Sequence, residues 1–204
     1  MQTTAFLQLL KDSSLQLLAF ADELRPQYSI EILETADGPG RWNCIQVLEH
    51  LNSYYRYYFP LFEKEFDRKM TASRQQPPSD YRASWLGGYL TRSMLPKQNA
   101  LALKMKAFKN HSPVAGMDAN KVIAEFIGQQ RRLIELINRA AAVDLRSIRI
   151  GISIARWVKL PLGDLLSFLV AHNERHHFQM EKLLGLAHLP FALEQEWSKK
   201  TVGT

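Results

Sequence analysis

Hydrophobic residues recur every three or four positions along four long segments of the chain, which is the period of an amphipathic α-helix. The first segment ends near the sequence RPQYS at residues 25–29, and the second covers about residues 41–70. The third covers residues 119–142 and the last about residues 161–186. Four helices of this length joined by polar loops predict an all-α fold, an up-down four-helix bundle built as one domain over residues 1–204.

Turn and cap residues indicate where these helices begin, end or bend. The sequence DGPG at residues 37–40 is typical of a turn between the first two helices. Pro60 lies inside the second helical pattern, which predicts a kink or a break there. Asp118 or Asn120 is expected to cap the third helix, and Pro161 is expected near the start of the last.

Two stretches do not fit the helical pattern. Residues 81–108 mix apolar residues with Gly87, Gly88 and Pro96, and we predict a long irregular insertion with short helical pieces between the second and third helices. Isoleucine occupies every second position from Ile148 to Ile154, which indicates a strand. No second segment with this pattern is evident, so the strand is expected to be an extended connector or an edge that pairs across a dimer.

The composition is that of a soluble globular protein, with 46% hydrophobic and 23% charged residues. A single cysteine, Cys44, excludes an internal disulfide and a cysteine-based zinc cage, and it suits a reducing cytoplasm. Cys44 itself is expected to be a small buried residue. No apolar run approaches the roughly 20 residues of a membrane span. The N-terminal segment also lacks the basic region of a signal peptide. A cytoplasmic protein without membrane contact is therefore expected.

The formal net charge is +6, and much of it lies in residues 131–159. This segment could be a nucleic-acid patch, a funnel for an anionic substrate, or a solvated surface. We favour a solvated surface, because scattered arginines need no partner and the chain contains no nucleic-acid-binding module. Nucleic acid is therefore not an expected partner.

Histidines on the apolar face of the predicted helices are the main candidates for chemistry. His172 and His176 lie one turn apart on the apolar stripe of the last helix, where two imidazoles can bind one metal ion. His50, at the edge of the apolar face of the second helix, could supply a third ligand. Three histidines leave an open position, as a catalytic divalent metal requires. The alternative is that they are hydrogen-bonded core residues. His177 is rotated by about 100° from His176 and is not expected to share the ion.

Other polar residues lie near these histidines in the sequence. Tyr54, one turn past His50, is a candidate substrate-binding residue, although the aromatic cluster around it is expected to be mainly core. Glu174 and Glu181 are expected on the polar face of the last helix. No general acid or base can be assigned.

Two segments together resemble a known family. RWNCIQVLEHL at residues 41–51 places a tryptophan eight residues before a histidine, and PLGDLLSFLVAHNERHHFQMEKL at residues 161–183 has a histidine, a His-His pair and a glutamine in a fixed order. This pattern is similar to the DinB/YfiT-like family of metalloenzymes. The resemblance implies a dimeric four-helix bundle with a divalent metal on His50, His172 and His176. His177 and Gln179 match the motif without being ligands.

The resemblance also implies a class of reaction. Activities of the family centre on low-molecular-weight thiols, such as bacillithiol transfer and mycothiol-dependent isomerisation. We therefore expect a thiol S-transferase that uses zinc, nickel or iron, a small-molecule substrate and possible binding of a free thiol. A metal-dependent hydrolase and a non-enzymatic helical binding protein are the alternatives. The insertion and the isoleucine segment depart from the simplest family members, which leaves the substrate open.

Overall fold

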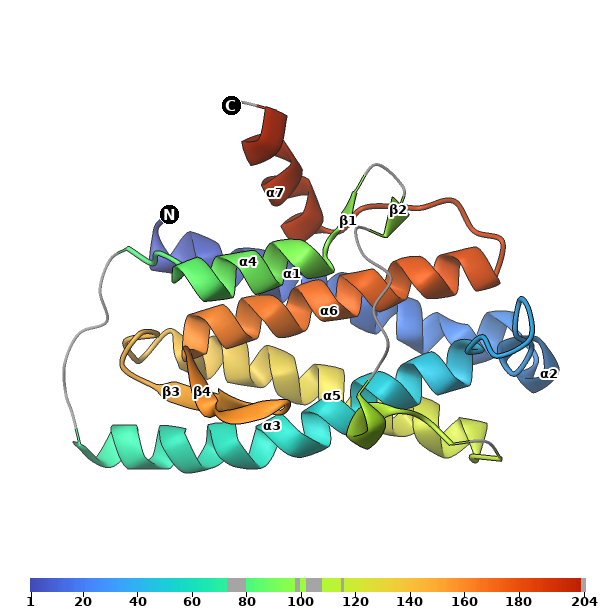
Figure 1. Ribbon diagram of the computed structural model, residues 1–204, viewed down its shortest axis with the longest axis horizontal. Coiled ribbons are helices and arrows are strands. Elements are labelled where there is room, and N and C mark those ends of the chain that lie inside the picture. Colours follow the sequence, from blue (N-terminus) through green and yellow to red (C-terminus); the bar gives the residue numbers. More distant parts are fainter. Residues whose placement is uncertain (73–79, 98–99, 102–107, 115, 203–204) are drawn as a thin grey trace.

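The computed structural model describes residues 1–72, 80–97, 100–101, 108–114 and 116–202. This part of the chain is mostly helical, as predicted (Figure 1). Its helices are α1 (Thr3–Gln27), α2 (Ile30–Leu33), α3 (Cys44–Ala72), α4 (Trp85–Met94), the 3₁₀ helix η1 (Lys109–His111), α5 (Ala119–Ala140), α6 (Leu162–Leu183) and α7 (Ala192–Val202). Its strands form two antiparallel pairs, β1 (Pro96–Lys97) with β2 (Ala100–Leu101) and β3 (Arg149–Ile152) with β4 (Ala155–Pro161).

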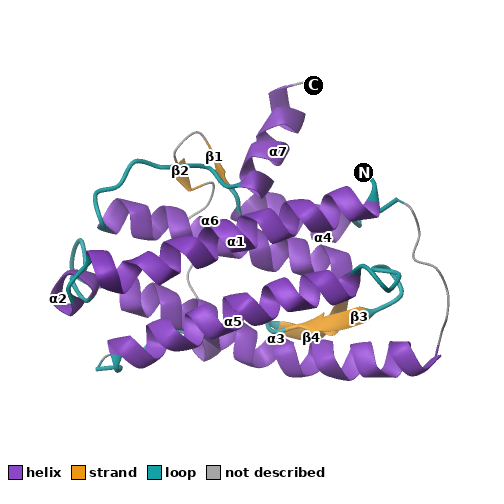
Figure 2. Ribbon diagram, turned by 180° about the vertical axis from the view of Figure 1, so that it is seen from behind, coloured by secondary structure: helices purple, strands orange, loops and turns teal. Residues whose placement is uncertain are grey.

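The four long helices predicted from the sequence are α1, α3, α5 and α6, and α1 and α3 each pack against both α5 and α6. Seen from behind, α1 and α5 lie side by side (Figure 2). Helices α1 and α6 run in one direction, whereas α3 and α5 run in the other (Figure 1). This order differs from the strict alternation expected of an up-down bundle. The reason is that α4 runs opposite to α3, so the chain returns to the end where α3 begins before α5 starts.

The helix boundaries agree closely with the sequence pattern. The apolar residues of α1 that recur at helical spacing are buried, and the Ser14 hydroxyl among them donates to the Leu10 carbonyl at 2.8 Å. Helix α3 continues through Pro60 without a break, because burial of large residues on both sides of it, such as Tyr55 and Phe62, offsets one lost hydrogen bond. Asp118 caps α5 by accepting from the Lys121 backbone amide at 3.2 Å.

Helix α6 lies in the middle of the molecule and is buried along most of its length (Figure 1). It contacts α1, α3, α4 and α7 as well as both strands of the β3–β4 pair. Glu174 and Glu181, expected on a polar face, are only 2% and 3% exposed, so that prediction was wrong. Periodicity predicted the helix correctly, but α7 and the segment that leads into it lie against the two glutamates that were assigned to solvent.

Helix α4 is fastened to α6 by one buried carboxylate. Asp164 accepts hydrogen bonds from the Tyr81 hydroxyl, the Ser84 hydroxyl and the Ser84 backbone amide, the last at 3.1 Å. A Cβ atom at Gly87 would lie 2.2 Å from Cγ of Asp164, so this approach requires glycine. The described part of the predicted irregular insertion is therefore largely one anchored helix. Residues 98–99 and 102–107 of that insertion lie outside the described residues.

The isoleucine segment has a partner within the chain, which corrects the prediction of a lone connector or a dimer edge. Strand β3 pairs with β4 in the register Ile150 to Leu160. The backbone amide of Ser153, in the turn, donates to the Tyr58 hydroxyl at 2.9 Å and ties the hairpin to α3. The sequence did not reveal β4 because its burial does not alternate. Its last two residues, Leu160 and Pro161, are both buried where the strand meets α6.

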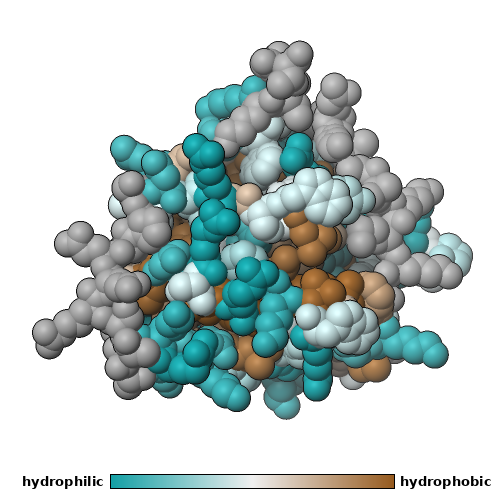
Figure 3. Space-filling model, turned by 60° about the vertical axis from the view of Figure 1, so that its left-hand side comes forward, coloured by the Kyte–Doolittle hydropathy of each residue, from teal (hydrophilic) through white to brown (hydrophobic). Residues whose placement is uncertain are grey.

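The basic segment is mostly paired with acidic or aromatic side chains. Arg132 and Arg139 both contact Glu63, at 3.4 and 2.7 Å, and Arg156 lies over the ring of Tyr57. These contacts favour a solvated, charge-balanced surface. Figure 3 shows apolar patches between polar side chains on one end of the molecule. Among the described residues, no helix combines the length and apolarity needed to cross a membrane.

Candidate metal centre

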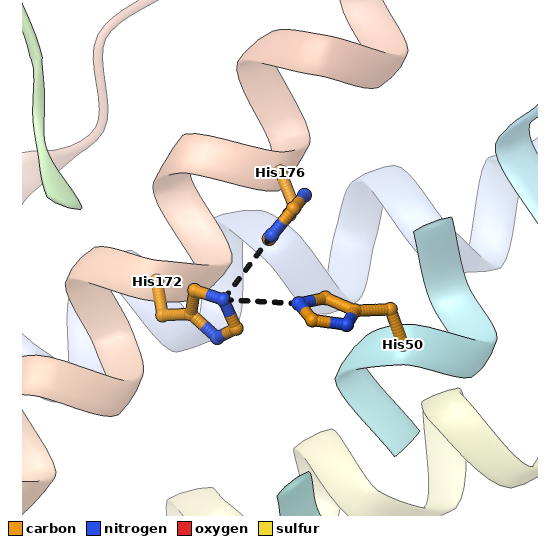
Figure 4. Close-up of side chains that lie close together, drawn as sticks. All are labelled: His50, His172 and His176. Atoms are coloured by element: carbon orange, nitrogen blue, oxygen red, sulfur yellow. Dashed lines mark hydrogen bonds between the residues drawn. The ribbon is translucent and has the colours of Figure 1, made fainter. Parts of the chain in front are cut away.

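Three histidine rings from two helices converge inside the molecule. His172 and His176 come from α6 and His50 comes from α3, and their rings turn toward a common point (Figure 4). Nε2 of His172 lies 3.3 Å from Nε2 of His50 and 3.1 Å from Nε2 of His176. All three residues are at least nine-tenths buried. The structure thus brings together the three predicted metal-ligand candidates, which we call the three-histidine cluster.

Hydrogen bonds on the far side of two rings determine which nitrogen carries the proton. Nδ1 of His50 lies 2.7 Å from the His111 carbonyl, which can only accept. Nδ1 of His176 lies 3.0 Å from Oε1 of Gln179, which also accepts. Each Nδ1 therefore carries the hydrogen, and each Nε2 presents a lone pair to the common point.

Burial keeps these rings uncharged. It lowers the pKa of His50, and it lowers the pKa values of His172 and His176 well below the usual value, with neighbouring histidines adding to the effect. At neutral pH the cluster is a set of neutral imidazoles, which is the form that binds metal ions.

A divalent cation fits this donor set. Nε2 of His172 can donate a proton to only one of its two neighbours, so a cluster of core histidines would leave lone pairs facing each other without a proton between them. A tetrahedral ion with nitrogens at about 2.0–2.1 Å would hold them roughly 3.3–3.4 Å apart, close to the two separations observed. Three histidines and no carboxylate in the cluster leave room for a further ligand.

Aromatic residues surround the cluster. The Tyr54 ring lies 4.6 Å from that of His172 and 5.2 Å from that of His50. The Trp42 ring lies 4.9 Å from the His50 ring, and Phe168 stacks on His172 at 5.8 Å. Tyr54, the predicted substrate-binding residue, therefore lies beside the cluster as well as in the core. Burial raises its pKa, so its hydroxyl stays protonated at neutral pH.

His111, a residue that the sequence did not single out, supports His50. Its ring stacks on Tyr54 at 3.9 Å, and its Nδ1 lies 2.9 Å from the Ser53 hydroxyl. The Ser53 hydroxyl donates its hydrogen to the His50 carbonyl at 2.6 Å, so it can only accept from His111, whose Nδ1 therefore carries the proton. His111 is the last residue of the short 3₁₀ helix η1, which is too short to show a periodicity, so no sequence signal could have found it. Gln179 had such a signal, since it lies three residues after His176 on one helix face.

Cys44 does not take part in the cluster. It is fully buried, and burial raises the pKa of its thiol to about 12. A thiol with that pKa is not a nucleophile at neutral pH, which agrees with the buried role predicted for it.

A second group of possible metal ligands lies on the other side of α6. His177 Nδ1 and His188 Nδ1 lie 3.6 and 2.6 Å from Oε2 of Glu181, and His188 Nε2 lies 3.1 Å from Oε2 of Glu194. We call these four residues the histidine–glutamate cluster. His177 lies between Phe20 and Phe191, away from the three-histidine cluster, as expected for a residue rotated from His176.

Comparison with known proteins supplies an independent result. A model of the DinB superfamily matches residues 3–180, which include α1, α3, α5 and all three clustered histidines. No curated protein and no solved structure matches the chain. Since the family model covers most of the chain, including residues 41–51 and residues 161–180 of the two segments that carry the sequence resemblance, the protein belongs to the DinB superfamily.

Proposed function

We propose that this protein is a divalent-metal-dependent enzyme in which His50, His172 and His176 hold the metal and which transfers low-molecular-weight thiols. The observation that supports this most directly is the convergence of three Nε2 atoms, with His50 and His176 held as Nδ1–H tautomers. Membership of a superfamily that generally binds metal adds to it. Zinc, nickel and iron all suit imidazole ligands, so the donor set leaves the choice of metal open.

The side chains around the cluster suit a small organic substrate. The partly exposed rings of Trp42 and Phe168 provide apolar surface beside the ligands. The protonated hydroxyl of Tyr54 would donate a hydrogen bond to a polar atom of the substrate. These contacts would orient the substrate and limit the entry of water.

The chemistry of the site favours thiol transfer over other reactions. A bound divalent cation supplies a Lewis acid that stabilises a thiolate relative to its thiol. Three neutral imidazoles leave the positive charge at the site uncompensated, which favours an anionic ligand. The thiol must come from a small molecule, because the single cysteine is buried and protonated.

The first experiment measures metal content by plasma mass spectrometry on protein purified without an affinity tag. We expect near-stoichiometric metal in the wild type and its loss in a His172→Ala, His176→Ala double variant. His177→Ala is the matched control, since it removes the adjacent histidine of the same helix and should retain the metal. A wild type that stays metal-free after reconstitution with zinc, nickel and iron would rule out the proposal.

The second experiment separates the classes of function. The metal-loaded protein is given cysteamine or bacillithiol with the electrophile chlorodinitrobenzene, and separately p-nitrophenyl acetate without thiol. Consumption of the electrophile that depends on both thiol and metal supports transfer. Ester cleavage without thiol would favour a hydrolase, and no turnover with retained metal would favour a binding protein.

Three further features are part of the proposal. We propose that α1, α3, α5 and α6 form one four-helix bundle domain in which residues 81–108 are an insertion. We also propose that the protein is a homodimer and that it works in the cytoplasm. The nearly complete exposure of Trp85 and Trp157, at 83% and 84%, supports a contact with a second copy. Size-exclusion chromatography with light scattering would test the dimer.

A further inference from the structure

The three ligand histidines differ in how their rings are held. The Nδ1–H of His50 donates to a backbone carbonyl, which no side-chain substitution can remove. The Nδ1–H of His176 donates to the side chain of Gln179. Among the described residues, His172 has no hydrogen-bond partner at Nδ1. The tautomer of His176 is therefore the one that a single side chain controls.

We propose that Gln179 is a positioning residue that holds His176 in the Nδ1–H tautomer and thereby sets the affinity of the three-histidine cluster for its metal. This inference rests on the proposed function. Gln179 lies three residues after His176, so the two side chains share one face of α6. Its Oε1 is 3.0 Å from Nδ1 of His176.

The alternative tautomer explains why the glutamine matters. Without an acceptor at Nδ1, the His176 proton could move to Nε2, where it would donate to Nε2 of His172, only 3.1 Å away. That hydrogen bond would use two of the three ligand nitrogens at once. By accepting at Nδ1, Gln179 keeps the lone pair of His176 Nε2 available. Hydrogen-bond partners of this kind typically contribute 10- to 100-fold to metal affinity.

Gln179 is also a residue that can be changed without opening the core. It is partly exposed, unlike its neighbours Phe178 and Met180, which are fully buried. Gln179→Leu keeps the approximate size and removes the acceptor. Gln179→Glu keeps an acceptor and strengthens it, because a carboxylate accepts more strongly than an amide.

The test uses two measurements on the whole protein. In metal-free, ¹⁵N-labelled protein, long-range ¹H–¹⁵N spectra of the histidine rings report each tautomer, and His50 serves as an internal reference. Zinc affinity is measured with zinc chloride against a chromophoric chelator. We expect His176 to be Nδ1–H in the wild type and in Gln179→Glu. In Gln179→Leu it should shift toward Nε2–H, with zinc binding weakened 10- to 100-fold. Gln179→Glu should bind zinc at least as tightly as the wild type.

Two results would overturn the inference. One is an Nε2–H tautomer for His176 in the wild type. The other is a Gln179→Leu variant with an unchanged tautomer and a zinc affinity within twofold of the wild type. A wild type that binds none of zinc, nickel and iron while showing the expected tautomers would instead reject the proposed function, because the tautomer measurement needs no metal.

Discussion

Two histidine clusters lie on opposite sides of α6, and their imidazole nitrogens have different partners. In the three-histidine cluster, neutral imidazoles turn their lone pairs toward one point, and no carboxylate compensates for a cation. In the histidine–glutamate cluster, both nitrogens of His188 lie within hydrogen-bond distance of carboxylates, those of Glu181 and Glu194. The first arrangement offers its lone pairs to a cation, whereas in the second the carboxylates favour the charged form of His188.

The charge on His188 follows from its partners. A ring that donates from both nitrogens is an imidazolium. Burial opposes this charge, but the hydrogen bonds to Glu181 and Glu194 outweigh it and raise the pKa of His188. The separation of 2.6 Å between Nδ1 of His188 and Oε2 of Glu181 is that of a charge-assisted hydrogen bond. We interpret this cluster as a structural tie between α6 and the segment that leads into α7, rather than as a second metal site.

The largest expected effect separates the clusters by their response to zinc. At free zinc of about 1,000 times its dissociation constant, the free energy of unfolding of the wild type should rise by about 4 kcal/mol. His50→Asn should abolish this gain, since asparagine can still donate to the His111 carbonyl but offers no Nε2. The measurement is urea unfolding in zinc buffers. His177→Asn should keep the gain, and its loss there would mean that the clusters are not independent.

The next effect concerns the buried ion pair. Glu181→Gln should lower the free energy of unfolding of the metal-free protein by about 3 kcal/mol, because it leaves the charge of His188 poorly compensated in a buried site. Urea unfolding of the two proteins gives the difference. Glu135→Gln, on the exposed face of α5, should change it by about 0.5 kcal/mol or less. Metal content should be unchanged in both variants. Loss of metal from Glu181→Gln would contradict the structural role of the histidine–glutamate cluster.

The smallest expected effect is on the pH dependence of the free energy of unfolding, to which His172 and His188 contribute with opposite signs. The folded pKa of His172 is lowered, so the metal-free protein should lose stability as the pH falls below about 6.5, where only the unfolded chain takes up the proton. The folded pKa of His188 is raised, so its contribution should be complete below about 6.5 and lost as the pH rises through the folded value. Each histidine contributes at most about 1.4 kcal/mol per pH unit.

Difference curves against single variants isolate these two contributions. His172→Asn should flatten the acidic side of the stability profile of the metal-free protein, and His188→Gln should flatten the side above pH 6.5. Thermal unfolding across the pH range provides both curves. If His188→Gln changed only the acidic side, the ring would be neutral in the folded protein and the interpretation as an imidazolium would be wrong.

The sequence predicted those parts of the site that depend on local spacing. The four-residue spacing of His172 and His176 placed both on one face of a helix. His177 follows His176 directly, which placed it on a different face. The apolar stripe of the second segment indicated that His50 faces inward. Periodicity could not predict which helix or loop packs against each face of a helix. Glu174 and Glu181 were assigned to solvent because the sequence of α6 does not reveal that α7 and the segment before it pack against these residues.

By itself, the sequence determined the four long helices, their buried stripes and the three histidines that point into the core, because side-chain period is a local property of a helix. Only the tertiary structure decided the direction of α5 relative to α3, the partner of β3 and the hydrogen bonds that His111 and Gln179 make with ligand rings. It also decided that the pKa values of the three clustered histidines are lowered and that the pKa of His188 is raised. Those properties depend on burial and on groups distant in the chain, which meet only when the helices pack.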